Sequence, residues 1–319
     1  MSEVLYYHHG RFQLAGGVLP NAITAYRTYG NPKNPCILFP TCYGGRLDNR
    51  GLMGQDYMIG EDKVLNPSKY YIVTVALFSN GESSSPSNTP APYNGPHFPH
   101  VSYEDNIRAQ HALLTKGLGI EKLFCVIGVS MGGQQAYHWA AMYPDFVERF
   151  VAICSAARTN DLSRAFQEGF KAAFVCSKDF DNGYYKTRPE IAMHAFSRAI
   201  GPWIYSQAWF AQKGYLHDGM VSSMENFMCG AWDAGFLPWD ANDLLVLMRT
   251  WGQGDISLVN GGNGDLAQCL ANVKAKGLIM PCKTDLFFPP EENIKEVASM
   301  RGNGRLALID SIWGHMSEL

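Results

Sequence analysis

The stretch from Phe124 to Ala140, FCVIGVSMGGQQAYHWA, constrains the fold more than any other part of the chain. Its first residues form a short apolar run typical of a buried strand, and the residues after Ser130 have the character of a helix. Gly128 and Gly132 flank the serine in a Gly-x-Ser-x-Gly pattern. Glycines are needed at such a corner because a Cβ there would strike the neighbouring strand or helix. The pattern therefore predicts a strained turn that lifts the Ser130 hydroxyl above the edge of a sheet.

Apolar runs of strand length recur along the chain, with helix-like segments between them. Continuous apolar runs are typical of strands that are buried on both faces of a parallel sheet. The pattern predicts an α/β protein with a mainly parallel sheet and helices on both faces. A hairpin is expected over residues 10–30, and SYED predicts a helix that opens at Ser102 with a capping box. The strand-like runs lie at 35–41, 70–77, 123–128, 150–155, 277–282 and 305–310.

Residues 156–276 interrupt this alternation, because they are helix-like, contain five of the seven tryptophans and include no clear buried strand. We interpret them as a helical lid, inserted into an α/β core formed by residues 1–155 and 277–319. The alternative is that these helices form a second core or a dimer face. In the latter case the protein would be a homodimer. The loop at residues 79–99 has the composition of a low-complexity linker. A linker in the middle of a sheet domain is not expected, so we predict a long ordered loop near a site.

A serine hydroxyl becomes a strong nucleophile only beside a base, and the base needs an orienting carboxylate. In folds that carry the Gly-x-Ser-x-Gly corner, the three residues follow in the order serine, acid, histidine. His315 is the one histidine after the last predicted strand. Asp285 directly follows the strand at 277–282, whereas Asp310 ends the last strand only five residues before the histidine. We expect Asp285 to be the acid, with Asp310 as the alternative.

Composition argues against several classes of function. A net charge of −3 and a pI of about 6.3 provide no basic field for nucleic acid. No apolar stretch approaches the roughly 20 residues of a membrane span, and the N-terminus does not resemble a signal peptide. The eight cysteines include no Cys-x-x-Cys pair, so we expect reduced thiols in a cytoplasmic protein rather than a metal site. No motif indicates a cofactor.

Several segments together resemble the homoserine O-acetyltransferase family of α/β-hydrolases. GVSMGGQQAYHWAAMYPDFV is similar to the corner and helix of that family, and PWDANDLLVLMRTWGQGDIS is similar to its lid helix. KTDLFFPPEE and WGHMS are similar to its acid and base segments, and the similar segments span nearly the whole chain in the right order. The resemblance implies the α/β-hydrolase fold, with Ser130 as nucleophile, Asp285 as orienting acid and His315 as base. It also implies an oxyanion hole built from the backbone amides of Cys42 and Met131.

The lid motif departs from the family pattern at one position. The Arg-Phe-Asp-Ala-Asn of the family reads Pro-Trp-Asp-Ala-Asn here, so Pro238 stands in the place of the arginine. Homoserine carries a carboxylate, which a closed pocket binds best with a planar, bidentate cation. Four other lid arginines remain as substitutes: Arg158, Arg164, Arg188 and Arg198. The aromatic residues of the lid instead favour an apolar pocket for a small-molecule ester, lined by Trp203, Trp209, Trp232 and Trp239, although lid packing would also explain them.

These features favour a serine esterase that acts on small acyl esters through an acyl-enzyme. The alternative is an O-acetyltransferase that moves acetyl from acetyl-CoA to a hydroxyl such as that of homoserine. Both reactions use the same residues and differ in whether water or an alcohol reaches the acyl-enzyme. A third possibility, a binding protein without catalysis, is disfavoured because the serine, the acid and the histidine are all present.

Overall fold

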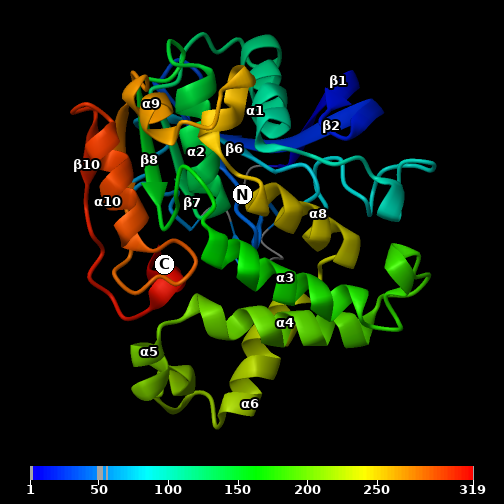
Figure 1. The fold of residues 1–319 in the computed structure, drawn as a ribbon. Coiled ribbons are helices and arrows are strands. Elements are labelled where there is room, and N and C mark those ends of the chain that lie inside the picture. The colour runs from blue at the N-terminus through cyan, green and yellow to red at the C-terminus, as the bar shows by residue number, and fades with distance from the viewer. Residues whose placement is uncertain (1–2, 49–52, 55–56, 319) are drawn as a thin grey trace.

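The computed structural model describes residues 3–48, 53–54 and 57–318. An eight-stranded sheet runs through the molecule in the order β1-β2-β6-β3-β7-β8-β9-β10 (Figure 1). The pairs β1–β2 and β2–β6 are antiparallel, and every later pair is parallel. The bounds are β1 (Leu5–Leu14), β2 (Gly17–Tyr29), β3 (Cys36–Pro40), β6 (Tyr71–Val75), β7 (Cys125–Val129), β8 (Arg149–Ile153), β9 (Lys276–Met280) and β10 (Gly304–Leu306), beside a separate pair β4 (Gly45–Arg46) and β5 (Met53–Gly54).

The predicted strands all lie in this sheet, and two of them differ in extent from the prediction. The hairpin turns at Ala15 and Gly16, and β2 then continues through Pro20. An irregular register near Gly10 accommodates the proline, which has no N–H to give to the ladder. The last strand, expected over residues 305–310, is paired only over three residues, followed by a single bridge at Ile309.

Helices cover one face of the sheet: α1 (Tyr103–Ala112), α2 (Met131–Met142), α9 (Leu266–Ala271) and α10 (Pro290–Ser299). Residues of these helices share an apolar cluster with the strand residues Leu38, Val73 and Val126. The capping box predicted at the start of α1 is confirmed, since the Ser102 and Asp105 side chains each accept a hydrogen bond from the other's backbone N–H. The apolar cluster on the other face of the sheet includes Leu65 and, partly buried, Tyr57, Met58 and Ile59.

The segment between β8 and β9 is helical, as expected, and Figure 1 shows α3 and α4 side by side at the carboxyl ends of the parallel strands. Besides α9, its α-helices are α3 (Asp161–Val175), α4 (Glu190–Ile204), α5 (Gln207–Ala211), α6 (Met224–Phe227), α7 (Ala234–Phe236) and α8 (Ala241–Gly252), with a π-helical turn η5 (Met228–Asp233). Ile256, Leu270 and Val273 pack in the apolar cluster of the sheet rather than in the lid. The boundary of the lid at residue 276 therefore stays a prediction, and this packing favours an earlier end. None of the described helices is long and apolar enough to cross a membrane.

The loop at residues 79–99 is ordered because its serines complete the hydrogen bonding of the sheet. The Ser83 hydroxyl accepts from the Ala25 amide at 3.0 Å, and the Ser84 hydroxyl accepts from the Ile23 amide at 2.9 Å. Both amides belong to β2 at a position where no neighbouring strand pairs with it on that side. The loop thus takes the place of a strand there.

Candidate active site

Ser130 lies at the corner between β7 and α2, in the strained backbone conformation that the glycine pattern predicts, with φ of +54°. A Cβ on Gly128 would lie 2.0 Å from the Gly132 carbonyl oxygen, so the strand and the helix approach closely only because that position is glycine. The Ser155 hydroxyl donates a hydrogen bond of 2.7 Å to the Ser130 carbonyl. The close packing at Gly128 and the hydrogen bond to the Ser130 carbonyl therefore hold the strained corner in place.

The structure brings the three candidate catalytic side chains together. His315 Nε2 lies 2.9 Å from Ser130 Oγ, and His315 Nδ1 lies 2.7 Å from Asp285 Oδ2. The second carboxylate oxygen of Asp285 accepts from the backbone amides of Phe287 and Phe288, at 2.8 and 3.2 Å. Ser130, Asp285 and His315 are 8%, 4% and 7% exposed, so these hydrogen bonds are shielded from water. This geometry suits a serine nucleophile with a histidine base and a carboxylate that orients the histidine.

Asp310, the alternative acid, does not reach this group. It is exposed, and its carboxylate forms an ion pair of 3.2 Å with Lys283. The difference between the two aspartates follows from the loops that carry them. Asp285 lies in the turn directly after β9, whereas Asp310 lies beyond the short β10 at the edge of the sheet.

One hydroxyl joins the loop of the acid to the loop of the base. Thr284 Oγ1 donates to the Ser311 carbonyl at 2.8 Å and accepts from the Gly314 amide at 3.1 Å. Thr284 precedes Asp285, and Gly314 precedes His315. The backbone on both sides of the Asp285–His315 hydrogen bond is therefore held by the same side chain.

The lid also contacts the loop of the base. The Ser206 hydroxyl, just after α4, donates a hydrogen bond to the Ile312 carbonyl. Gly314 has a φ of +64°, and a Cβ there would lie 2.7 Å from the Ile204 carbonyl oxygen at the end of α4. This close approach requires glycine, and it packs the end of α4 directly against the residue before His315.

The two amides predicted for an oxyanion hole lie beside Ser130 in the fold. Met131 is the first residue of α2, where a backbone N–H has no partner within the helix. Cys42 follows β3 and lines the same cavity as Ser130. The Gln135 side chain donates to the Thr41 carbonyl at 2.9 Å, and the planar trans peptide then directs the Cys42 N–H the opposite way. The role of these amides stays a prediction.

Ser130 and His315 open into a cavity of about 450 Å³ between the core and the lid. Its described lining contains no arginine, lysine, aspartate or glutamate. Burial raises the pKa of Tyr43 well above its usual value and that of Tyr205 to about 12, so both phenols stay neutral. The cavity is thus apolar and uncharged away from the catalytic group. Its larger apolar side chains are Tyr43, Ile200, Ile204, Tyr205, Trp232, Phe236, Trp251, Phe287 and Met316.

Of the four tryptophans predicted for the pocket, the structure brings only Trp232 to the lining of this cavity. Trp203 packs on Phe166 and is 40% exposed, while Trp209 stacks on Tyr205 with ring centroids 3.8 Å apart. Trp239 is buried beneath the Arg46 guanidinium. These three serve the packing of the lid, which was the alternative explanation for them.

Sequence reasoning missed every aromatic residue of the cavity lining except Trp232, among them Trp251 and Phe287. Their rings lie 5.2 Å apart, and Phe287 also contacts the His315 ring at 5.3 Å. Phe287 stands two residues after Asp285, and that proximity to the acid was the available signal. Trp251 is near the end of α8, and nothing in its local sequence distinguishes it from the packing tryptophans.

The lid arginines that remained as substitutes for the missing family arginine all bind carboxylates elsewhere. Their nitrogen–oxygen distances are 2.7 Å for Arg158–Asp255, 3.1 Å for Arg164–Asp161, 3.3 Å for Arg188–Glu190 and 2.8 Å for Arg198–Asp233. None of the four lines the Ser130 cavity. Pro238, at the motif position itself, is exposed.

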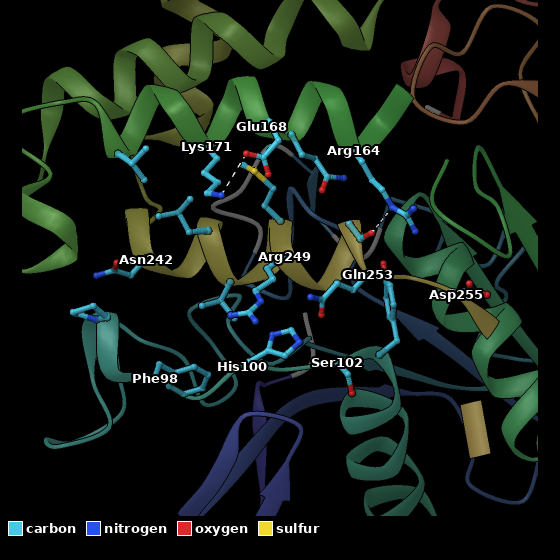
Figure 2. Close-up of a pocket in the computed structure, with 18 of the residues that line it drawn as sticks. Phe98, His100, Ser102, Arg164, Glu168, Lys171, Asn242, Arg249, Gln253 and Asp255 are labelled. Atoms are coloured by element: carbon cyan, nitrogen blue, oxygen red, sulfur yellow. Dashed lines mark hydrogen bonds and ion pairs between the residues drawn. The ribbon is translucent and has the colours of Figure 1, made fainter. Parts of the chain in front are cut away.

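A second and larger cavity, of about 1210 Å³, lies between α3, α8 and the segment after the long loop (Figure 2). Figure 2 shows Lys171 paired with Glu168 on α3, and His100 beside Arg249 below α8. Neither Ser130 nor His315 lines it, so the long loop ends near this cavity and not near the candidate nucleophile. Among the described residues, no group of three side chains is arranged to hold a metal ion. The candidate nucleophile and base thus line the smaller cavity and not the larger one.

The mainly parallel sheet, the strained serine corner and the Ser–His–Asp hydrogen bonds define an α/β-hydrolase. The family described as "alpha/beta hydrolase fold" matches residues 35–175. An ethyl acetate hydrolase from Pseudomonas veronii is 37% identical over 97% of this chain and 90% of its own length. The crystal structure of an acetylester hydrolase from Corynebacterium glutamicum has a TM-score of 0.92 and 32% identity, covering 98% of this chain and 90% of the other.

A homoserine O-acetyltransferase from Methanococcus vannielii is more distant, at 28% identity over 94% of this chain and 66% of its own length. The chain belongs to the homoserine O-acetyltransferase-like family of α/β-hydrolases. The resemblance found in the sequence and the predicted fold class are thereby confirmed. The esterase relatives are the more similar ones.

Proposed function

We propose that this protein is a serine esterase that hydrolyses short acyl esters, acetyl esters foremost, through an acyl-enzyme on Ser130. The observation that carries the proposal is the pairing of the Ser130–His315–Asp285 geometry with a cavity that has no charged lining residue in the described chain. Such a cavity suits a neutral ester. The names of the more similar relatives, an ethyl acetate hydrolase and an acetylester hydrolase, support the same reaction.

In this proposal the reaction proceeds in two balanced steps. Ser130 Oγ attacks the ester carbonyl carbon while its proton passes to His315 Nε2, and the oxyanion is held by the amides of Cys42 and Met131. The carbonyl re-forms, and the alcohol leaves with the proton from His315. A water molecule then attacks the acyl-Ser130 carbonyl, its proton passes through His315 to Ser130 Oγ, and the carboxylic acid is released.

The acetyltransferase alternative is disfavoured by the same cavity. Homoserine would bring a carboxylate and an ammonium group into it, and burying a charge without a partner costs several kcal/mol. The family arginine is replaced by Pro238, and the four lid arginines considered as substitutes, Arg158, Arg164, Arg188 and Arg198, are engaged with carboxylates. Homoserine therefore competes poorly with water for the acyl-enzyme, and hydrolysis is favoured over transfer.

The test is product partitioning combined with one substitution. We expect the protein to release acetate from p-nitrophenyl acetate and ethyl acetate without an acceptor, and homoserine at millimolar concentration not to accelerate it. Ser130→Ala should lower turnover by several orders of magnitude and abolish labelling by a fluorophosphonate, while circular dichroism stays unchanged. Acetyl-homoserine as the main product from acetyl-CoA would overturn the esterase proposal in favour of the transferase.

We also propose that the protein works in the reducing environment of the cytoplasm. All eight cysteines are free thiols, and burial raises the pKa of Cys36 and Cys125 to about 12, which suppresses their reactivity. Cell fractionation tests this, and recovery of activity only outside the cytoplasm would contradict it. A homodimer stays a prediction.

A further inference from the structure

The Ser130 cavity is larger than an ester such as ethyl acetate needs. Its volume of about 450 Å³ lies within the range of roughly 300–1,000 Å³ of sites that enclose drug-sized ligands. An acetyl group places only a methyl beyond the carbonyl carbon, so an acetyl ester bound at Ser130 leaves most of this space for its alcohol part. This inference rests on the proposed function, because it takes the acyl group to be small.

The polarity of the walls restricts what that alcohol part can be. Ser130 and His315 supply the polar groups at the catalytic end of the described lining, and its other side-chain polar groups, the hydroxyls of Tyr43 and Tyr205 and the indole N–H groups of Trp232 and Trp251, are uncharged. The Tyr43 hydroxyl donates to the Leu244 carbonyl at 3.1 Å and is therefore engaged. Ile200, Trp232 and Phe236 line the same cavity and offer mainly hydrocarbon and ring surface.

Residues of the segment from η5 to α7 line two parts of the cavity, its inner wall and its mouth. Trp232 and Phe236 are buried, at 2% and 1% exposure, and form the inner wall. Gly230 and Ala234 line the same cavity but are exposed, so they lie at its mouth. A Cβ added to Gly230 meets no atom within 4 Å, so the space beside it is open. The mouth is therefore wide because its residues are small.

We propose that the alcohol part of the substrate is an extended apolar group, a medium-length alkyl chain or an aromatic ring, and that Gly230 and Ala234 keep the mouth open for it. Each methylene buried in the cavity should raise kcat/KM, at roughly 0.8 kcal/mol or about fourfold per group. A longer acyl chain should not raise kcat/KM in the same way, because it displaces the reacting carbonyl from the position that Ser130 and His315 require.

The experiment compares two matched ester series by titrating the released acid. In the acetate series the alcohol lengthens from ethyl to butyl to hexyl, and in the ethyl ester series the acid lengthens from acetate to butyrate to hexanoate. We expect kcat/KM to rise at least tenfold from ethyl to hexyl acetate and to fall along the acyl series. A flat or falling acetate series overturns this inference. Loss of hydrolysis for every ester, ethyl acetate included, overturns the proposed function instead.

Substitutions at the mouth test the assignment of its residues. Gly230→Leu should lower the ratio of kcat/KM for hexyl acetate to that for ethyl acetate at least tenfold. Gly169→Leu, at an exposed glycine of α3 that likewise has no atom within 4 Å of a Cβ, is the control and should leave the ratio unchanged. If Gly230→Leu does not fold by circular dichroism, Ala234→Leu takes its place. An unchanged ratio in the folded mouth variant overturns the role of these residues.

Discussion

At the scale of single residues, the proposed site depends on a choice between two aspartates. Asp285→Asn should lower kcat by roughly 10³- to 10⁴-fold, because the amide no longer holds the histidine in its productive tautomer. Asp310→Asn should leave kcat within about twofold, since this residue is exposed and only pairs with Lys283. Steady-state kinetics with p-nitrophenyl acetate decide between them. A larger loss for Asp310→Asn than for Asp285→Asn would show that the acid has been assigned to the wrong residue.

A second residue-scale prediction concerns the hydroxyl that joins the two catalytic loops. Thr284→Val removes both hydrogen bonds at nearly constant volume, and each is worth about 1 kcal/mol. We expect kcat to fall about tenfold with KM little changed, because the geometry of Asp285 and His315 loosens while the cavity is retained. Thr284→Ser, which keeps the hydroxyl, should restore most of the rate.

The control for this prediction is a threonine with a similar role elsewhere. Thr250→Val removes a buried hydroxyl that donates to the Val101 carbonyl at 2.8 Å, away from the catalytic loops. It should lower the midpoint of thermal unfolding as much as Thr284→Val but leave kcat unchanged. Equal losses of kcat in both valine variants would mean that lowered stability, and not loop geometry, explains the effect.

At the scale of elements, the corner between β7 and α2 allows a sharp comparison of two glycines. Gly128→Ala would place a Cβ 2.0 Å from the backbone oxygen of Gly132, which cannot move without separating the helix from the strand. We expect this variant to be insoluble or to unfold well below the wild-type temperature. Gly169→Ala in α3 meets no atom within 4 Å and should stabilise the protein by up to about 1 kcal/mol through helix propensity. Thermal unfolding of both variants tests this, and a stable Gly128→Ala protein would contradict the close packing.

The elements of the sheet could be predicted because buried parallel strands have a strong sequence signal. The 305–310 run was overestimated because β10 is an edge strand, where apolar residues pack without pairing along their full length. The corner glycines and the chain order located Ser130, Asp285 and His315, although their catalytic roles stay predictions. The cavity walls could not be predicted, because nothing in the local sequence shows that Trp251 lines the cavity whereas Trp209 stacks on Tyr205 in the lid.

At the scale of the whole molecule, a buried histidine makes the fold sensitive to acid. His138 in α2 is 2% exposed and stacks on Tyr103, and burial lowers its pKa to about 4, against about 6.5 in the unfolded chain. The unfolded state therefore binds a proton first as the pH falls from about 6.5 to about 4. The stability that the neutral histidine provides is complete above pH 6.5 and is lost on acidification, by about 2 kcal/mol at pH 5.

His138→Gln removes this titration, so its free energy of unfolding should depend less steeply on pH. Urea unfolding at pH 7.5, 6 and 5 measures the effect in both proteins. The wild type should lose about 2 kcal/mol more than the variant over that range, whatever their difference at pH 7.5. Parallel pH profiles would assign the acid sensitivity to other groups.

The contact between the end of α4 and the loop of His315 has a consequence for protein engineering. The Ser206 side chain and the close approach at Gly314 tie the segment that covers the substrate to the segment that carries the base. A chimera that exchanges helices 161–252 for those of a relative would therefore alter proton transfer as well as substrate choice. A change of specificity by lid exchange therefore requires that the donor sequence reproduce Ile204, Ser206 and their partners Ile312 and Gly314. The segment to exchange is the lid together with the loop that carries His315.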